Sequence, residues 1–322
     1  MAYTTINKST AYFNTKLYTG NGNAGNAQTG VGFQPDLVWL KSRTNNEYHN
    51  FYDSVRGVTK RLSIPPAGAP ESTISGLTAF GTDGFTVGSA DTANKNNETF
   101  ASWNWKETAT AGFDIVSYTG SGSAKTVAHN LGVIPQLIIV KRYNDGTASW
   151  MVYNQNLGSN KYLSLDATAA QATGHWNDTS PTASVFSVGT DQRVNANNAY
   201  YIAYVFAEKQ GYSKFGSYTG NSNADGAFVY TGFKPSFVML KSSTSIEEWV
   251  IFDNKRLGYN PDNNALIVSN SAEATDNDID FLSNGFKLRR NTGYVNDNGK
   301  IYIYMAFGQS LVGSNNIPAT AR

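Results

Sequence analysis

The chain contains no cysteine, so neither disulfide bonds nor cysteine-ligated metal sites can stabilise it. Charged residues make up only 15% and the formal net charge is +1, which excludes the strongly basic surface typical of proteins that bind nucleic acid or anionic membranes. No stretch approaches a membrane-spanning length, and the polar first ten residues lack the apolar segment of a secretion signal. We therefore expect a protein that is made in the cytoplasm of its producer, binds no nucleic acid and does not insert into a membrane.

Histidine is also scarce, with only His49, His129 and His175 in the whole chain. Each could act as a general base, or could lie at the surface or cap a chain end, and a catalytic triad is defined by geometry rather than by the presence of histidine. The three lie in different local settings, and no Gly-x-Ser-x-Gly nucleophile turn is present. The sequence therefore predicts no catalytic residue, no cofactor-binding residue and no metal ligand.

What the sequence does contain is an internal repeat of about 100 residues. Tyr-Thr-Gly occurs at 18–20, 118–120 and 218–220. A glycine followed three residues later by a proline recurs in each copy, at Gly32 and Pro35, Gly132 and Pro135, and Gly232 and Pro235. This spacing predicts three tandem copies of one module.

Each copy has the pattern of a β-rich module. An apolar run follows each repeated proline, at 36–41, 136–141 and 236–241, and predicts a central strand that is buried on both faces. An aromatic strand closes each copy, and only Asp166–Thr173 could form a helical turn. We predict an all-β protein of three tandem β-sandwich modules, of jelly-roll or lectin-like type.

The landmarks divide the chain into five parts. We predict an N-terminal arm (1–10), repeat 1 (11–108), repeat 2 (109–210), repeat 3 (211–311) and a C-terminal tail (312–322). The linkers are short, so adjacent modules pack with little freedom, either as a rod or as a pseudo-threefold disc.

Five segments of the first copy resemble a repeat module of tailed-bacteriophage virion proteins from aquatic, cyanophage-like phages. They are Tyr-Thr-Gly-Asn-Gly at 18–22, Gly-Phe-Gln-Pro-Asp-Leu-Val-Trp-Leu-Lys at 32–41, Asp-Ser-Val-Arg-Gly at 53–57, Gly-Phe-Thr-Val-Gly at 84–88 and Trp-Asn-Trp-Lys at 103–106. The resemblance implies a non-enzymatic, surface-exposed virion structural protein, most readily a tail-associated fibre or adhesin component that contacts the host surface. The alternatives are a capsid decoration or head-fibre protein that docks through a terminal arm, and a polysaccharide-degrading enzyme.

The same resemblance implies location in the virion, assembly in multiple copies, and partners among the other tail or capsid proteins and host surface glycans. Because the first repeat begins close to Met1, we expect no separate virion-anchoring domain ahead of it. We expect the polar loops 65–75, 166–180 and 268–278, which differ between copies, to form the contact region.

Two sets of residues are candidate ligand contacts. A lysine ends the apolar run of every copy, and either contacts an acidic sugar or phosphate or extends from a buried strand end to solvent; these lysines are Lys41, Lys141 and Lys241. In the variable loop of the second copy, Trp176 is the best candidate for an exposed sugar-stacking ring, with His175 beside it. Three other tryptophans fall in predicted core strands: Trp39, Trp150 and Trp249.

Acidic clusters are the remaining candidates. Glu247 and Glu248 adjoin a predicted hairpin, and Asp276, Asp278 and Asp280 alternate before a strand. A glycosidase needs two carboxylates across a cleft, and an oxygen-rich loop such as 276–280 or 297–299 could hold calcium. Neither cluster recurs in the other copies and the calcium-loop spacing is absent, so we expect solvated loop acids.

Overall fold

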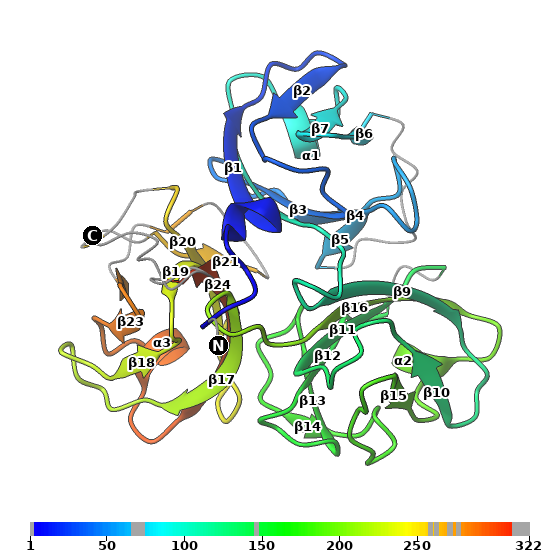
Figure 1. Ribbon diagram of the computed structural model, residues 1–322, viewed down its shortest axis with the longest axis vertical. Helices are drawn as coiled ribbons and strands as arrows, with labels where there is room; N and C mark the ends of the chain where they lie inside the picture. The colour runs from blue at the N-terminus through cyan, green and yellow to red at the C-terminus, as the bar shows by residue number, and fades with distance from the viewer. Residues whose placement is uncertain are drawn as a thin grey trace.

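The computed structural model describes residues 3–65, 75–144, 148–256, 260, 264–268, 273–274 and 278–310. Within these residues the chain is built almost entirely from antiparallel strands, which confirms the predicted all-β class. The described helices are single turns, far too short to cross a membrane. The strands form three lobes, and Figure 1 shows them arranged around a common centre.

The first lobe pairs a five-stranded sheet, in the order β1-β8-β3-β4-β5, with a three-stranded sheet, in the order β2-β7-β6. Its elements are η1 (Ser9–Ala11), β1 (Phe13–Thr19), β2 (Asn26–Thr29), β3 (Leu37–Ser42), β4 (His49–Asp53), β5 (Leu62–Ile64), β6 (Leu77–Gly81), β7 (Gly84–Val87), α1 (Asp91–Asn94) and β8 (Thr99–Trp105).

The second lobe repeats this order as β9-β16-β11-β12-β13, extended by β14, with β10 and β15 forming the smaller sheet. Its elements are β9 (Phe113–Thr119), β10 (Lys125–Ala128), β11 (Leu137–Arg142), β12 (Met151–Asn154), β13 (Lys161–Ser164), β14 (Ala172–Thr173), β15 (Val185–Val188), α2 (Gln192–Asn195) and β16 (Tyr200–Phe206). The helical turn predicted within Asp166–Thr173 is wrong, because this segment ends in the edge strand β14, which pairs with β13.

The third lobe has the order β17-β24-β19-β20-β21 in its large sheet and β18-β23-β22 in its small one. Its elements are β17 (Ser213–Thr219), β18 (Phe228–Tyr230), β19 (Lys234–Ser242), β20 (Val250–Asp253), β21 (Leu266–Ile267), β22 (Ile279–Leu282), β23 (Gly285–Leu288), α3 (Gly293–Asn296) and β24 (Ile301–Gln309).

The apolar run after each repeated proline forms the central strand of a large sheet, as predicted. In β3, Val38 and Leu40 face the core between the two sheets of the first lobe. The alternate residues, Leu37 and Trp39, face a second core on the other side of the large sheet. Because successive side chains of a strand point to opposite faces, a strand between two cores must be apolar at every position.

The second core is shared by all three lobes and lies between their large sheets. At its centre three residues occupy equivalent positions, since Trp105, Phe206 and Phe307 each pair with the first apolar residue of the central strand. Their ring centroids lie 6.3, 5.8 and 6.1 Å apart, so each ring contacts the other two. The lobes therefore form a pseudo-threefold disc around this aromatic centre, and not a rod (Figure 1).

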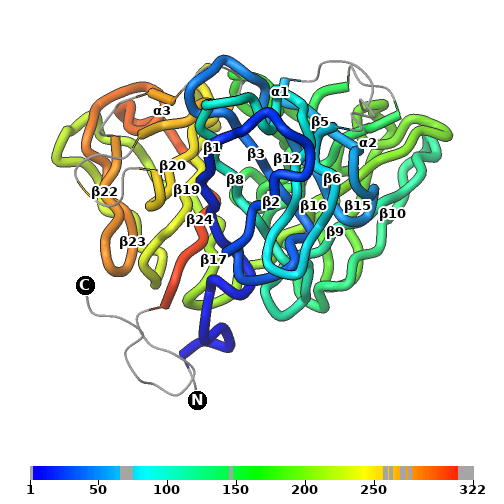
Figure 2. Tube along the Cα trace, turned by 90° about the horizontal axis from the view of Figure 1, so that it is seen from above, coloured from blue at the N-terminus to red at the C-terminus, as the bar shows by residue number. Residues whose placement is uncertain are grey.

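The start of the chain is packed against the third lobe and is not a free arm. The side-chain hydroxyl of Thr4 donates to the Gln210 carbonyl at 2.7 Å, and the Ser9 amide donates to the Gln309 side chain at 2.9 Å. Between them Ile6 is buried in the shared core. Figure 2 shows this segment on one face of the disc, with α1, α2 and α3 toward the opposite face.

A buried asparagine closes each short helix, and it recurs at a spacing of 101 residues: Asn94, Asn195 and Asn296. The side-chain amide of Asn94 donates to the carbonyls of Gly88 at 2.7 Å and Asn23 at 2.8 Å. Its side-chain oxygen accepts from the backbone N–H of Asn21 at 3.0 Å. These bonds fix the turn that follows β1 against the end of the lobe, and they have equivalents in the other two lobes.

Replacing Asn94 by alanine is expected to cost about 1–3 kcal/mol, because it leaves buried backbone groups without partners. Amide hydrogen exchange should accelerate over residues 20–26, and urea unfolding should give the loss of stability. Asn96→Ala is the matched control, since Asn96 is exposed two residues away. Equal effects of the two substitutions would contradict the assigned role.

Candidate functional site at the lobe interfaces

The three repeated lysines lie inside the protein. Lys41 and Lys241 are fully buried and Lys141 nearly so. The Lys41 ammonium donates to the carbonyls of Glu47 at 2.6 Å and Asn45 at 3.1 Å, and burial lowers its pKa to about 8. The interpretation that these side chains reach solvent is wrong, because the backbone of the following hairpin supplies the acceptors and encloses the charge.

Lys241 shows that this arrangement also joins lobes. Its ammonium donates to its neighbour Ser242 at 2.6 Å and to the carbonyl of Thr168, in the second lobe, at 3.1 Å. Burial lowers its pKa to about 8 as well. The loop 166–180, which is predicted to belong to the contact region, is therefore partly an interlobe contact at Thr168. The predicted loops 65–75 and 268–278 lie largely outside the described residues.

Trp176 and His175 are buried, with 1% and 5% of their surfaces exposed, so the predicted exposure of this pair is wrong. The chain adopts positive φ at His175, Asn177 and Asp178, which turns both rings inward. Trp176 packs edge-on against Tyr153 at 5.8 Å, and burial lowers the pKa of His175 to about 4. The residues that follow, 177–180, are exposed, as are Ala169, Ala172 and Thr173 earlier in the loop.

All three histidines are buried, so a surface role is wrong for each. The His129 ring nitrogen lies 3.1 Å from the Thr182 carbonyl and joins two loops of the second lobe.

The predicted core tryptophans Trp39, Trp150 and Trp249 are buried, as expected.

Two acids of the third lobe, Asp278 and Asp280, are also buried, so the prediction of solvated carboxylates is wrong for them. Arg289 contacts the Asp280 carboxylate and Nε of Arg290 lies 3.6 Å from Asp278, so each of these carboxylates has a guanidinium group beside it. Glu247 and Glu248 are half-buried, and Asp276 lies outside the described residues. Over the described ranges no group of three His, Cys, Asp or Glu side chains could hold a metal ion.

The residues that do converge lie where neighbouring lobes meet. The residue four positions before the last residue of β4, β12 and β20 carries a ring that donates to a backbone carbonyl of a neighbouring lobe. The acceptors lie on β21, β5 and β13, respectively. The three bonds are His49 to Ile267 at 3.0 Å, Trp150 to Ser63 at 3.0 Å and Trp249 to Ser164 at 2.8 Å. The interfaces thus share one threefold-related contact, in which His49 takes the place of a tryptophan.

The contact between His49 and Trp39 explains why a histidine replaces the tryptophan at this position. Trp39 occupies the position held by Ile139 and Met239 in the other lobes, and its indole N–H donates to Nδ1 of His49 at 2.8 Å. Nε2 of His49 must then carry the proton that is donated to Ile267. Burial, with Lys41 and Arg256 nearby, holds the pKa of His49 well below its ordinary value of 6.5.

Acid is therefore expected to weaken the contact between the first and third lobes. The unfolded chain binds the His49 proton more tightly than the folded chain, so this contribution is intact above pH 6.5 and is lost as the pH falls below it. The limiting slope for one proton is about 1.4 kcal/mol per pH unit. Urea unfolding between pH 7.5 and 5 measures it.

The double variant Trp39→Met/His49→Trp is the control, because it copies the pair Met239 and Trp249 of the third lobe. Subtracting its pH profile from that of the natural protein isolates the contribution of His49. Identical slopes would contradict the assigned protonation state.

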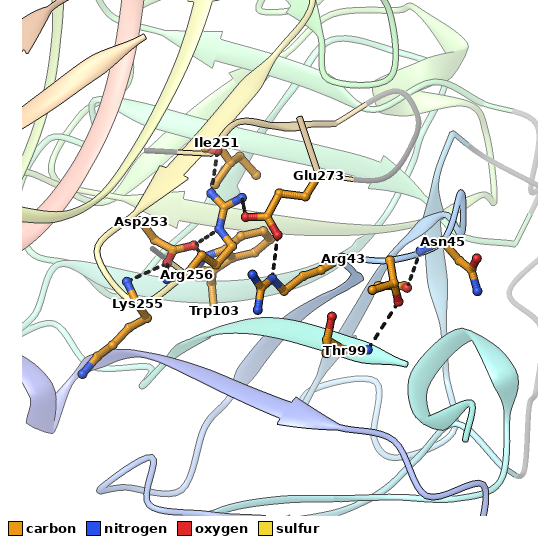
Figure 3. Close-up of polar contacts among 11 residues, drawn as sticks. Arg43, Asn45, Thr99, Trp103, Ile251, Asp253, Lys255, Arg256 and Glu273 are labelled. Carbon is orange, nitrogen blue, oxygen red and sulfur yellow. Dashed lines mark hydrogen bonds and ion pairs between the residues drawn. The ribbon is translucent and has the colours of Figure 1, made fainter. Parts of the chain in front are cut away.

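A buried ion pair lies beside this contact at the interface of the third and first lobes (Figure 3). The Arg256 Nε atom lies 2.7 Å from Oδ2 of Asp253, and both side chains are almost completely buried. The Trp103 indole N–H, from the first lobe, donates to the same oxygen at 3.1 Å. Glu273 then bridges Nη1 of Arg256, at 3.4 Å, and Nε of Arg43, at 2.7 Å.

The interface of the first and second lobes has an equivalent buried ion pair, which also accepts one hydrogen bond from the neighbouring lobe. The Arg56 Nε atom lies 2.6 Å from Oδ2 of Asp53, and the Tyr204 hydroxyl, from the second lobe, donates to that oxygen at 2.8 Å. The interface of the second and third lobes has lost the whole arrangement. Its equivalent residues are Asn154, Leu157 and Met305.

A cleft of about 430 Å³ opens at the interface of the first and second lobes. It is lined by Val55, Arg56, Lys60, Ser117, Tyr143 and Asn144. The Tyr143 ring, at the position of Arg43 in the first lobe, has its centroid 6.0 Å from the Arg56 guanidinium carbon. The sequence signal for this site is Asp-x-x-Arg, which recurs at 53–56 and 253–256 and is absent from the second copy.

Comparison with known proteins adds one relationship. Residues 8–310 match a family described as a domain of unknown function, DUF7483. No curated protein and no solved structure matches the chain. Because the single family match spans all three lobes and nearly the whole chain, the protein belongs to the DUF7483 family.

Proposed function

We propose that the protein is a non-enzymatic virion structural protein of a tailed bacteriophage, a tail-associated fibre or adhesin component that contacts the host surface. The observation that supports this most is the burial of side chains that the copies share. Two sets of side chains that the copies share, the lysines and the asparagines that end the short helices, are buried and help to build the body. Specific recognition then falls to residues that the copies do not share.

Exposed side chains at equivalent hairpins illustrate this. The loop between β3 and β4 exposes Tyr48, and the equivalent loop of the third lobe exposes Ile246, of which 76% is accessible. In the second lobe, 177–180 are exposed beside the buried Trp176. A rigid body that carries dissimilar exposed loops suits an attachment protein, because the scaffold tolerates loop change without loss of stability.

The alternative is a capsid decoration or head-fibre protein. Docking through the N-terminal arm is disfavoured, since Thr4 and Ser9 are bonded to Gln210 and Gln309 of the same chain. The C-terminal tail, 312–322, lies outside the described residues.

Location in the particle tests the proposal. Purified virions are labelled with gold-conjugated antibody against this protein and imaged. Label on tails is the expected result, label on heads would support the decoration alternative, and absence from intact particles would overturn both. Turnover of host capsule by the isolated protein, lost on changing one carboxylate, would support the enzymatic alternative instead.

A further inference from the structure

The Arg56 guanidinium at the cleft is only partly satisfied. Its Nε bonds Asp53, and Nη2 lies 3.4 Å from the Phe51 carbonyl. Among the described residues Nη1 has no hydrogen-bond partner, although only 4% of the side chain is exposed. A buried charged donor without a partner is costly, so the site favours an added acceptor.

The equivalent guanidinium in the third lobe shows which acceptor suits this position. Nη1 of Arg256 contacts a carboxylate oxygen of Glu273 at 3.4 Å, and the other oxygen reaches Arg43 (Figure 3). The backbone amide of Glu273 also donates to the Arg43 carbonyl, at 3.0 Å.

The second lobe has neither the carboxylate nor the arginine of this contact. There Gln171 makes the equivalent backbone bond, to the Ser243 carbonyl at 2.9 Å, and the arginine is replaced by Leu157. The carboxylate is therefore present beside Arg256, where the arginine is kept, and absent beside Leu157, where the arginine is lost.

The cleft beside Arg56 provides room and charge for such a group. Lys60 is exposed at its rim, and none of the described residues that line it is acidic. We propose that this cleft binds a ligand carboxylate, which takes the place at Arg56 that Glu273 takes at Arg256. Because Nη1 is covered in the structure, we expect ligand entry to require movement of the half-buried Tyr143 ring, which lies beside the Arg56 guanidinium.

The lining also indicates the rest of the ligand. Tyr143 places an aromatic ring where the third interface has Arg43, and aromatic rings pack against the apolar faces of cyclic ligands. Ser117 and Asn144 offer neutral hydrogen-bonding groups. A hexuronic acid, with one carboxylate and several hydroxyls on a ring, fits this set. The choice of an acidic sugar rests on the proposed attachment function, whereas the carboxylate site does not.

Calorimetric titration of the full chain tests the site. The probes are glucuronate, its neutral counterpart glucose, acetate and inorganic phosphate. We expect glucuronate to bind, acetate to bind more weakly and glucose not to bind. Lys60→Gln should weaken glucuronate binding about tenfold, and the variant Asp53→Asn/Arg56→Leu, which copies Asn154 and Leu157, should abolish it.

Lys161→Gln is the matched control, because Lys161 holds the position of Lys60 in the second lobe, where the arginine is absent. No binding of glucuronate or acetate, or equal loss in the two lysine variants, would overturn the proposal. Tighter binding of phosphate than of glucuronate would overturn the assignment of a carboxylate.

Residues 66–74 lie outside the described part of the chain and include one acid, Glu71, so the titration is repeated on Glu71→Gln. Binding that appears only in that variant would overturn the proposal of an external ligand. Every titration uses isolated protein, so its result is independent of the labelling of virions. The proposed carboxylate site can therefore be wrong while the proposed function is right, and the reverse.

Discussion

Trp105→Ala is expected to lower the free energy of unfolding by about 3–5 kcal/mol, the range for a large aromatic side chain removed from a core. Trp105 is 1% exposed and its ring contacts Phe206 and Phe307, one from each of the other lobes. The cavity would therefore open where all three large sheets meet, and no single lobe could close it by local rearrangement. Urea unfolding monitored by circular dichroism measures the loss.

Trp105→Phe is the matched control. It copies the residue that both other lobes carry at this position, and it removes an indole N–H that has no partner among the described residues. We expect a change of less than about 1.5 kcal/mol, as for other conservative core exchanges. A loss in Trp105→Ala no larger than that of the phenylalanine variant would contradict the shared aromatic centre.

Asp253→Asn is expected to cost about 3–5 kcal/mol, because it removes the charge that compensates the buried Arg256. The Trp103 indole would also lose its charged acceptor. The same unfolding measurement applies, with the folded state checked by its near-ultraviolet dichroism.

The interface of the second and third lobes supplies the compensating set. In the variant Trp103→Met/Asp253→Asn/Arg256→Leu/Glu273→Gln, the interface carries the residues found at Met305, Asn154, Leu157 and Gln171. Replacing a buried ion pair by packed apolar groups is often neutral, so we expect this variant to recover most of the lost stability. A fourfold variant less stable than Asp253→Asn alone would show that the two interfaces are not equivalent.

The strands were predictable because their cause is local. A run such as Leu37–Leu40 must be apolar throughout when a core lies on each face, and the glycine and proline landmarks place that run in every copy. The hairpin after β11 was predictable for the same reason, although the centre of its turn, 145–147, lies outside the described residues.

The interfaces were not predictable, because they join residues that are far apart in the chain. A lysine after an apolar run has the same pattern whether it meets solvent or, like Lys41, backbone carbonyls. Trp176 lies in a polar loop, yet its ring is buried where the backbone turns through positive φ values at His175, Asn177 and Asp178. His49 could have been recognised as the counterpart of Trp150 and Trp249 by aligning the copies position by position. Its bond to Ile267, 218 residues away, could not.

Scanning calorimetry of the full chain tests most directly whether the three lobes are one body with a shared core. We predict a single transition whose calorimetric enthalpy equals its van't Hoff enthalpy, since the part of the shared core that each lobe contributes is exposed when its neighbours unfold. Two or three resolved transitions, or a van't Hoff enthalpy near one third of the calorimetric value, would show lobes that unfold independently and would contradict this account.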